Sequence, residues 1–167
     1  MSRFSLIGKN AVVTGGSRGI GRAIALGLAE AGADVVLTFR EKRGEAEQVV
    51  KQIEEFGRRA LALQMDVTER ASVAAAARDA RGIGAISILV NNAGINKPTD
   101  FDAVTDEDWD TILATNLKGP FVCAQTFLPL LSEAIRPAAT VFERTPCGAP
   151  KRSTTCASEI SPALEAA

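Results

Sequence analysis

The most informative stretch of this 167-residue sequence is Thr14-Gly15-Gly16-Ser17-Arg18-Gly19-Ile20-Gly21. It follows a short β-branched run and opens a stretch of helical periodicity, and this context makes a glycine pattern specific. Gly15 permits the tight turn out of a strand, Gly19 lets the backbone approach a pyrophosphate, and Gly21 allows close packing of helix on sheet. The free N–H groups and the helix dipole then favour phosphate. The stretch predicts a dinucleotide site; the alternative is a glycine-rich turn without a ligand.

Apolar runs of strand length alternate with stretches of helical periodicity on both sides of this loop. The expected strands are residues 10–14, 34–39, 60–65 and 86–90. The expected helices are residues 20–31, 45–56 and 68–81, with a long one that starts at Thr105 and continues towards Pro129. Short apolar runs bounded by glycine are typical of strands covered on both faces. The alternation predicts an α/β fold with a doubly wound parallel sheet and right-handed crossovers.

The pattern also predicts helix ends and inward faces. Gly32 and Gly57 are expected to end the helices before them, because glycine tolerates a left-handed cap. Asp108 takes the capping-box position three residues after Thr105. The side chains expected to face the core are Val49, Val50, Ile53 and Phe56 in the second helix, and Trp109, Ile112, Leu113, Leu117, Phe121 and Val122 in the long helix.

Composition and charge exclude several classes of function. The sequence is 46% hydrophobic and 23% charged, which is ordinary for a soluble globular protein. A net charge of −1 gives no electrostatic reason to expect nucleic acid or an anionic membrane as a partner. No apolar run approaches the roughly 18 residues of a membrane span, and residues 1–9 hold no apolar signal core. We therefore expect a cytoplasmic protein.

Metal and thiol chemistry are not expected. The chain has no histidine, and its three cysteines, Cys123, Cys147 and Cys156, form no Cys-x-x-Cys pair. An odd number of cysteines without a secretion signal indicates free thiols in a reducing compartment. Cys156 has no histidine to serve as its base, so we interpret it as a bystander. No metal site is predicted.

Three further motifs follow the expected strands or lie in the long helix. They are Asp66-Val67-Thr68, Asn91-Asn92-Ala93-Gly94, and Asn116 within Thr115-Asn116-Leu117-Lys118-Gly119. With the spacing Gly-x-x-x-Gly-x-Gly after Thr14, they resemble the short-chain dehydrogenase/reductase family over residues 4–133. The general pattern is similar to that of 3-oxoacyl-carrier reductases and sugar-acid dehydrogenases. The resemblance implies a Rossmann-like fold and an oxidoreductase that interconverts a small-molecule ketone and a secondary alcohol by hydride transfer.

The resemblance also implies which residues hold the cofactor. They are Gly15, Ser17, Arg18, Gly19, Ile20, Gly21, Arg40, Asp66, Val67, Asn92, Ala93 and Gly94. Alternatives stay open for some motif residues. Asp66 either faces the adenine or caps the following helix, and Asn91 either belongs to the site or only locks its strand end. Asn116 is either a solvated surface residue or, as in the family, an inward-facing residue that binds a water and feeds a proton relay.

The end of the second expected strand favours NADP over NAD. An NAD site usually has an acidic residue there, which accepts from the ribose 2′-OH. Phe39 and Arg40 occupy that place, and Arg40 together with Arg18 can pair with a 2′-phosphate. Glu41 weakens this interpretation. The alternative is that Arg40 is a solvated charge at the start of a loop.

The catalytic set of the resembled family is missing. Its members use a Tyr as proton donor, a Lys four residues later, and an upstream Ser that polarises the carbonyl. This chain has no tyrosine. The family pattern can be laid on Thr155-Cys156-Ala157-Ser158-Glu159, which puts Thr155 and Glu159 in the Tyr and Lys positions, and no serine lies near Phe142. A Thr hydroxyl is a far weaker acid than a phenol, so we assign neither residue a catalytic role.

Residues 135–167 lose the alternating rhythm and hold four of the seven prolines. We expect an incomplete, C-terminally truncated dinucleotide-binding domain over residues 1–134 and an irregular tail over 135–167, in which only residues 138–142 have the pattern of a strand. The tail is either out of frame or genuinely divergent, and we do not expect it to pack in an ordered way.

The functional hypotheses follow from this organisation. The chain is an NADP(H)-dependent oxidoreductase that is inactive as given, a catalytically dead dinucleotide-binding fragment, or an unstable product. Members of the resembled family assemble as homotetramers through the long helix and the one after it. Only the former is present here, which puts the tetramer in doubt.

Overall fold

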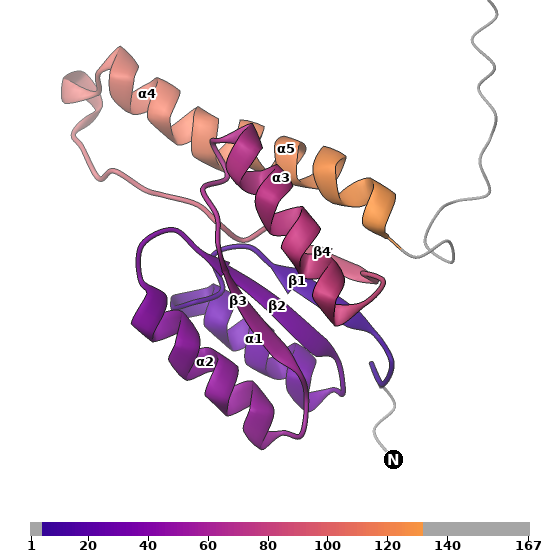
Figure 1. Ribbon diagram of the computed structural model, residues 1–167. Helices are drawn as coiled ribbons and strands as arrows, with labels where there is room; N and C mark the ends of the chain where they lie inside the picture. The colour runs from indigo at the N-terminus through magenta and orange to yellow at the C-terminus, as the bar shows by residue number, and fades with distance from the viewer. Residues whose placement is uncertain (1–4, 132–167) are drawn as a thin grey trace, which may run out of the picture. The chain divides into compact units, whose positions relative to one another are not determined.

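The computed structural model describes residues 5–131, which form a parallel sheet with helices on both faces (Figure 1). The strands are β1 (Asn10–Val13), β2 (Asp34–Phe39), β3 (Ala60–Gln64) and β4 (Ile88–Val90). Their order in the sheet is β3-β2-β1-β4, and every pairing is parallel. The chain adds β2 and β3 on one side of β1 and then places β4 on the other side. This is the doubly wound, Rossmann-like arrangement that the sequence predicts.

Helices cover both faces of the sheet. They are α1 (Gly19–Glu30), α2 (Arg43–Glu55), α3 (Arg70–Asp79), α4 (Asp106–Leu113) and α5 (Gly119–Phe127). Three short 3-10 turns, η1 (Ala80–Ile83), η2 (Phe101–Ala103) and η4 (Leu128–Leu130), and one π-helical segment, η3 (Ala114–Lys118), complete the described elements. α1 and α2 pack on one face, and α3 and α5 pack on the other (Figure 1).

The two central strands send alternate side chains into two separate cores. Val12 of β1 and Val36 of β2 pack with α3 and α5, around the fully buried Phe127. Val13 and Leu37 point the other way and pack with α1 and α2. Successive side chains of a strand lie on opposite faces. A strand covered on both faces therefore needs an unbroken apolar run, as the sequence pattern indicates.

The predicted boundaries of the first seven elements agree with the structure to within two residues. Gly32 has a φ of +104°, and the N–H of Ala33 donates to the carbonyl of Leu28 at 3.0 Å, which closes α1. Gly57 follows α2 with a φ of +71°. Phe56, in contrast, is 48% exposed, so its predicted inward orientation is wrong. Phe56 is the C-cap residue of α2, so it lies just beyond the helical turns whose buried side chains pack on the sheet.

The long helix differs most from its prediction. Thr105 does accept from the N–H of Asp108, at 3.1 Å, and α4 follows it. The helix is then interrupted by η3, whose wider turn shifts the phase of the side chains between α4 and α5. Trp109, Leu113, Leu117 and Phe121 are exposed, Ile112 is half-buried, and Val122 is buried. The predicted inward orientation is therefore wrong for the exposed four, because within residues 5–131 only one side of this helix is covered, by α3 and the sheet.

The irregular tail predicted for residues 135–167 lies outside the described residues, as do residues 138–142, Cys147 and Cys156. Within residues 5–131, no helix is both long enough and apolar enough to cross a membrane.

Candidate functional site

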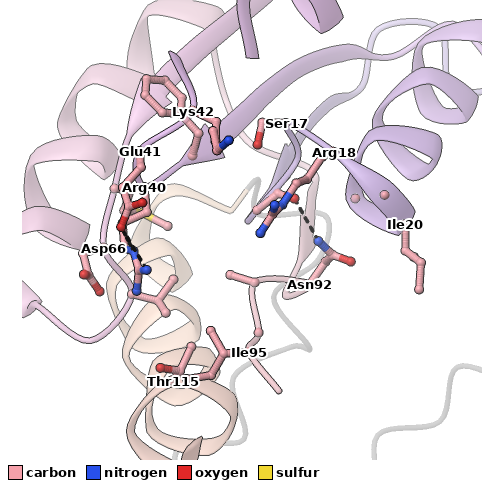
Figure 2. Close-up of a pocket in the computed structure, with 18 residues that line it drawn as sticks. Ser17, Arg18, Ile20, Arg40, Glu41, Lys42, Asp66, Asn92, Ile95 and Thr115 are labelled. Atoms are coloured by element: carbon pink, nitrogen blue, oxygen red, sulfur yellow. Dashed lines mark hydrogen bonds and ion pairs between the residues drawn. The ribbon is translucent and has the colours of Figure 1, made fainter. Parts of the chain in front are cut away.

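A pocket of about 350 Å³ lies at the carboxyl ends of the strands, beside the point where the strand order reverses (Figure 2). Ligand crevices of open α/β sheets form at such switch points, because the loops after the two strands diverge there. The lining includes all the residues predicted for the cofactor, namely Gly15, Ser17, Arg18, Gly19, Ile20, Gly21, Arg40, Asp66, Val67, Asn92, Ala93 and Gly94. It also includes Phe39, Glu41, Lys42, Met65, Ile95 and Thr115, which that prediction does not contain.

Three glycines shape the loop between β1 and α1. Gly15 has a φ of +65° and Gly19 a φ of +54°, a conformation that residues with a side chain adopt only with strain. A Cβ on Gly21 would clash with the carbonyl oxygen of Gly15 and with Nδ2 of Asn92, so its absence lets α1 start directly against the loop. A Cβ on Gly19 would meet nothing within 4 Å. The backbone of Gly19 is therefore open to whatever occupies the pocket.

The N-terminus of α1 has no capping side chain. Arg18 is the N-cap residue and makes no side-chain cap bond, and the first turn of α1 contains no acidic residue. The first N–H groups of an α-helix lack intrahelical acceptors and carry the positive end of the helix dipole. The guanidinium of Arg18 extends towards the pocket (Figure 2). The arrangement suits an anionic group such as a phosphate.

Polar groups tie the loop after β1 to the loop after β4. Nδ2 of Asn92 donates to the carbonyl oxygens of Thr14 and Gly15, at 2.9 and 3.1 Å. Oγ1 of Thr14 accepts from the backbone N–H groups of Asn92 and Ala93, at 3.0 and 2.9 Å. Asn91, which the sequence suggested as a lock for the strand end, is exposed. Asn92 performs that locking role and lines the pocket as well.

Sequence reasoning missed two supports of the glycine loop. The N–H of Gly15 donates to Oγ1 of Thr38 at 3.3 Å, and the N–H of Gly16 donates to the carbonyl of Thr38 at 2.9 Å. A Cβ on Gly16 would lie 2.7 Å from Cβ of Leu37, so this position also requires glycine. The one available signal in the sequence was a threonine among the apolar residues that follow Asp34 in this strand. Thr38 is 1% exposed in the structure.

The end of β2 places charged side chains beside the pocket. Phe39 is buried, and Arg40 follows it on the pocket wall, on the opposite side from Arg18 (Figure 2). Nε2 of Gln64 donates to the carbonyl of Arg40 at 3.0 Å, which fixes the backbone at this point. Glu41 forms an ion pair with Arg40 at 3.0 Å. A cation is thus available at the end of β2, but it has a carboxylate beside it.

Asp66 follows β3 and does not cap α3, so the predicted alternative that Asp66 caps the following helix is wrong. The N-cap residue of α3 is Glu69. Oδ1 of Asp66 accepts from the N–H and the hydroxyl of Thr68, at 2.8 and 2.7 Å, and its N–H donates to Oγ of Ser72 at 2.9 Å. These bonds hold the Asp66 carboxylate on the pocket wall beside Val67. Its contact with an adenine stays a prediction.

Asn116 lies in η3 and outside the pocket lining. Its Oδ1 accepts from the N–H of Ile95 at 2.9 Å, and its Nδ2 donates to the carbonyl of Ile95 at 2.8 Å. The side chain is exposed and holds the loop after β4 at two points. Its role in a proton relay stays a prediction. Thr155 and Glu159, the other positions compared with the family's catalytic set, lie outside the described residues.

Cys123 contributes no nucleophile to the pocket. It is fully buried in α5, within the core that includes Val122 and Phe127. Burial raises the pKa of the Cys123 thiol to about 11, because the thiolate would lose its hydration there. A thiol that stays protonated at neutral pH and is out of reach of solvent is chemically inert.

Comparison with known proteins agrees with this geometry. A family model described as short chain dehydrogenase matches residues 9–139. A 3-oxoacyl-[acyl-carrier-protein] reductase FabG from Aggregatibacter actinomycetemcomitans is 47% identical over 109 residues, which is 65% of this chain and 45% of that protein. The enzyme of the same name from a Staphylococcus epidermidis strain is 40% identical over 122 residues, or 72% of this chain and 50% of that protein. The chain thus spans about half the length of the curated relatives it matches.

Solved structures with the same arrangement cover the same part of the chain. A putative short-chain alcohol dehydrogenase from Sinorhizobium meliloti 1021 is 48% identical with a TM-score of 0.71, over 76% of this chain and 50% of that one. A short chain dehydrogenase from Burkholderia cenocepacia J2315 in complex with NADP is 43% identical with a TM-score of 0.73, over 77% and 53%. A blue fluorescent protein from a metagenomic library in complex with NADPH is 39% identical with a TM-score of 0.71, over 76% and 53%.

Proposed function

Since the chain belongs to the short-chain dehydrogenase family, we propose that its described residues form the NADP(H)-binding part of an oxidoreductase. The proposed reaction interconverts a small-molecule ketone and a secondary alcohol by hydride transfer. The observation that carries the proposal is the uncapped N-terminus of α1, which opens onto the pocket at Gly19. A pyrophosphate at this position would accept from N–H groups that no capping side chain satisfies.

The lining of the pocket fits a dinucleotide. Gly19 leaves room for a close approach of phosphate to the backbone, and Arg18 supplies a positive charge beside it. Asp66 and Val67, on the wall after β3, would face the adenine, and the loop that starts at Asn92 would lie against the rest of the cofactor. When bound, the nicotinamide carries the hydride, and the residues of this chain position it.

Charge at the end of β2 supports NADP(H) over NAD(H). Arg40 and Arg18 lie on opposite sides of the pocket and can both approach a 2′-phosphate. No carboxylate stands at the last residue of β2, where an NAD site usually has one. The relatives from Burkholderia cenocepacia and from the metagenomic library hold NADP and NADPH in their structures.

Turnover requires a proton donor that these residues do not supply. Hydride transfer to a ketone leaves an alkoxide, which needs a proton from a nearby acid. The 167 residues contain neither tyrosine nor histidine, so a phenol or imidazole would have to come from outside them. We therefore expect the 167-residue chain to bind the cofactor without reducing a ketone. The competing outcome is an unstable product that binds nothing.

Two measurements on the 167-residue chain test this proposal. NADPH fluorescence is titrated with the protein, and NADPH consumption is then followed with a panel of ketones. Saturable binding without consumption is the expected result.

Arg18→Gln is expected to weaken NADPH binding about tenfold, because it removes a charge-assisted bond. Arg78→Gln, which removes an exposed charge on α3 outside the pocket lining, is expected to leave binding unchanged. Absence of binding by the folded chain would refute the proposal.

A further inference from the structure

Arg40 and Glu41 are joined through one edge of the guanidinium. Oε1 of Glu41 accepts from Nε of Arg40 at 3.0 Å and lies 3.0 Å from its Nη2. The dashed contact between the two side chains is visible on the pocket wall in Figure 2. The Nε and Nη2 edge is one of the guanidinium edges that bind phosphate with two parallel bonds. Glu41 therefore occupies one of the guanidinium edges through which a 2′-phosphate could bind Arg40.

The other basic residues after β2 also have carboxylate partners. Nζ of Lys42 lies 3.6 Å from the Glu45 carboxylate, and Nη1 of Arg43 lies 3.8 Å from that of Glu47. Residues 40–47 therefore carry three cations and three acids, and this segment is close to neutral. Among residues 5–131, Arg18 is the basic residue of the pocket lining without an ion pair. Removal of one acid would leave one uncompensated positive charge at the end of β2.

We propose that Glu41 is a specificity-determining residue that narrows the preference for NADP(H) over NAD(H), an inference that rests on the proposed function. A 2′-phosphate must displace the Glu41 carboxylate before it can bind this edge of Arg40. NAD(H) has no 2′-phosphate and needs no such displacement. The Glu41 carboxylate also stays available as an acceptor for a ribose 2′-OH, the role that an acidic residue has in NAD sites.

The exposure of the pair decides how large this effect is. The side chains of Arg40 and Glu41 are 56% and 69% exposed, and ion pairs at such exposure contribute little to stability. A phosphate dianion is a stronger partner for the Arg40 guanidinium than a carboxylate, so Glu41 reduces NADP(H) affinity without abolishing it. The carbonyl of Arg40 stays bonded to Gln64, so only the side chain has to change partner. We expect a penalty of about two- to fivefold in NADP(H) affinity.

The test compares Glu41→Gln with a matched control in the 167-residue chain. Dissociation constants for NADPH and NADH are measured by nicotinamide fluorescence in each protein. In Glu41→Gln, the ratio of the NADH constant to the NADPH constant is expected to rise about two- to fivefold. The control is Glu47→Gln, which removes an equal charge from α2, where Glu47 is the ion-pair partner of Arg43. This variant should leave the ratio unchanged. An equal change of the ratio in both variants would overturn the inference, because a general charge effect would explain it.

A double-mutant cycle isolates the competition for Arg40. In the Arg40→Gln background, Glu41→Gln is expected to have no further effect on NADPH affinity, since no guanidinium is left to release. A full effect in that background would show that Glu41 repels the phosphate directly, and would overturn the inference. If NADPH binds with an unchanged ratio in Glu41→Gln, the inference fails and the proposed function stands. If neither NADPH nor NADH binds to the folded wild-type chain, the proposed function fails and the inference with it.

Discussion

Nδ2 of Asn92 donates a 2.9 Å hydrogen bond to the backbone carbonyl of Thr14, which precedes it by 78 residues. A second hydrogen bond joins the same residues, in which Oγ1 of Thr14 accepts from the backbone N–H of Asn92 at 3.0 Å. Thr14 is only 1% exposed, so water does not compete well for these groups. The two residues join the ends of β1 and β4, between which the strand order reverses. They fix the separation of the loops that form the pocket.

Asn92→Ala should therefore cost more than loss of a surface side chain. The substitution removes two hydrogen bonds and leaves the carbonyls of Thr14 and Gly15 without this partner. We expect the free energy of unfolding to fall by about 2–3 kcal/mol, as measured by urea denaturation. Asn91→Ala, at an exposed neighbouring position, should change it by less than about 0.5 kcal/mol. Equal losses in the two variants would show that the bonds of Asn92 contribute nothing measurable.

Two glycines of α1 should respond to alanine in opposite directions. A Cβ on Gly21 meets the carbonyl of Gly15 and the amide of Asn92, so Gly21→Ala forces the loop apart and should destabilise by about 1–3 kcal/mol. A Cβ on Gly27 meets nothing within 4 Å, so Gly27→Ala should stabilise α1 by about 0.5–1 kcal/mol. Thermal denaturation of the two variants gives the sign directly. Stabilisation by Gly21→Ala would contradict the packing role of this residue.

The sequence predicted the order of elements well, because local signals determine it. Gly32 ends α1 through a positive φ that its own residue type permits, and no distant contact is needed to foresee this. The motifs of the pocket were foreseen for a similar reason. Parallel strands bring their carboxyl ends to one edge of the sheet, so motifs such as those at Gly19 and Asn92 converge once the fold class is known.

Tertiary contacts and helix coverage could not be foreseen in the same way. The bond of Asn92 to Thr14 depends on β4 lying next to β1, which no local pattern encodes. Helical periodicity placed Leu117 and Phe121 on the apolar face of the long helix, but it cannot show whether another element covers that face. Both side chains are exposed. Asn116, in the π-helical segment, forms both of its bonds with Ile95, 21 residues earlier in the chain, and no local pattern indicates this contact. These features are properties of the assembled fold.

Gly19→Ala should separate cofactor binding from backbone strain. Alanine at a φ of +54° costs about 1–2 kcal/mol in the free energy of unfolding, and its Cβ would project into the space offered to the pyrophosphate. Gly57→Ala is the matched control, because Gly57 has a φ of +71°, open space around its Cβ and no place in the pocket lining. Both variants should lose similar stability, and only Gly19→Ala should weaken NADPH binding, measured by fluorescence titration. Equal binding by the two variants would argue against a pyrophosphate at Gly19.

Cys123 should make stability fall at alkaline pH. Burial raises the pKa of its thiol from 9.0 to about 11, so between these values the unfolded chain loses the proton while the folded chain keeps it. Deprotonation then favours the unfolded state, and the stability present below pH 9 is lost as the pH rises towards 11. The full window corresponds to roughly 2–3 kcal/mol, at about 1.4 kcal/mol for each pH unit.

Cys123→Ala is the control for this pH dependence, because alanine has no proton to lose and other titrating groups are unchanged. Urea denaturation between pH 8 and 10.5, with a reducing agent present, gives the free energy of unfolding for both proteins. The wild-type curve should fall more steeply above pH 9, so the difference between the two proteins should grow with pH in favour of the variant. Parallel curves would mean that the thiol ionises as easily in the folded chain as in the unfolded one, which its complete burial beside Phe127 does not allow.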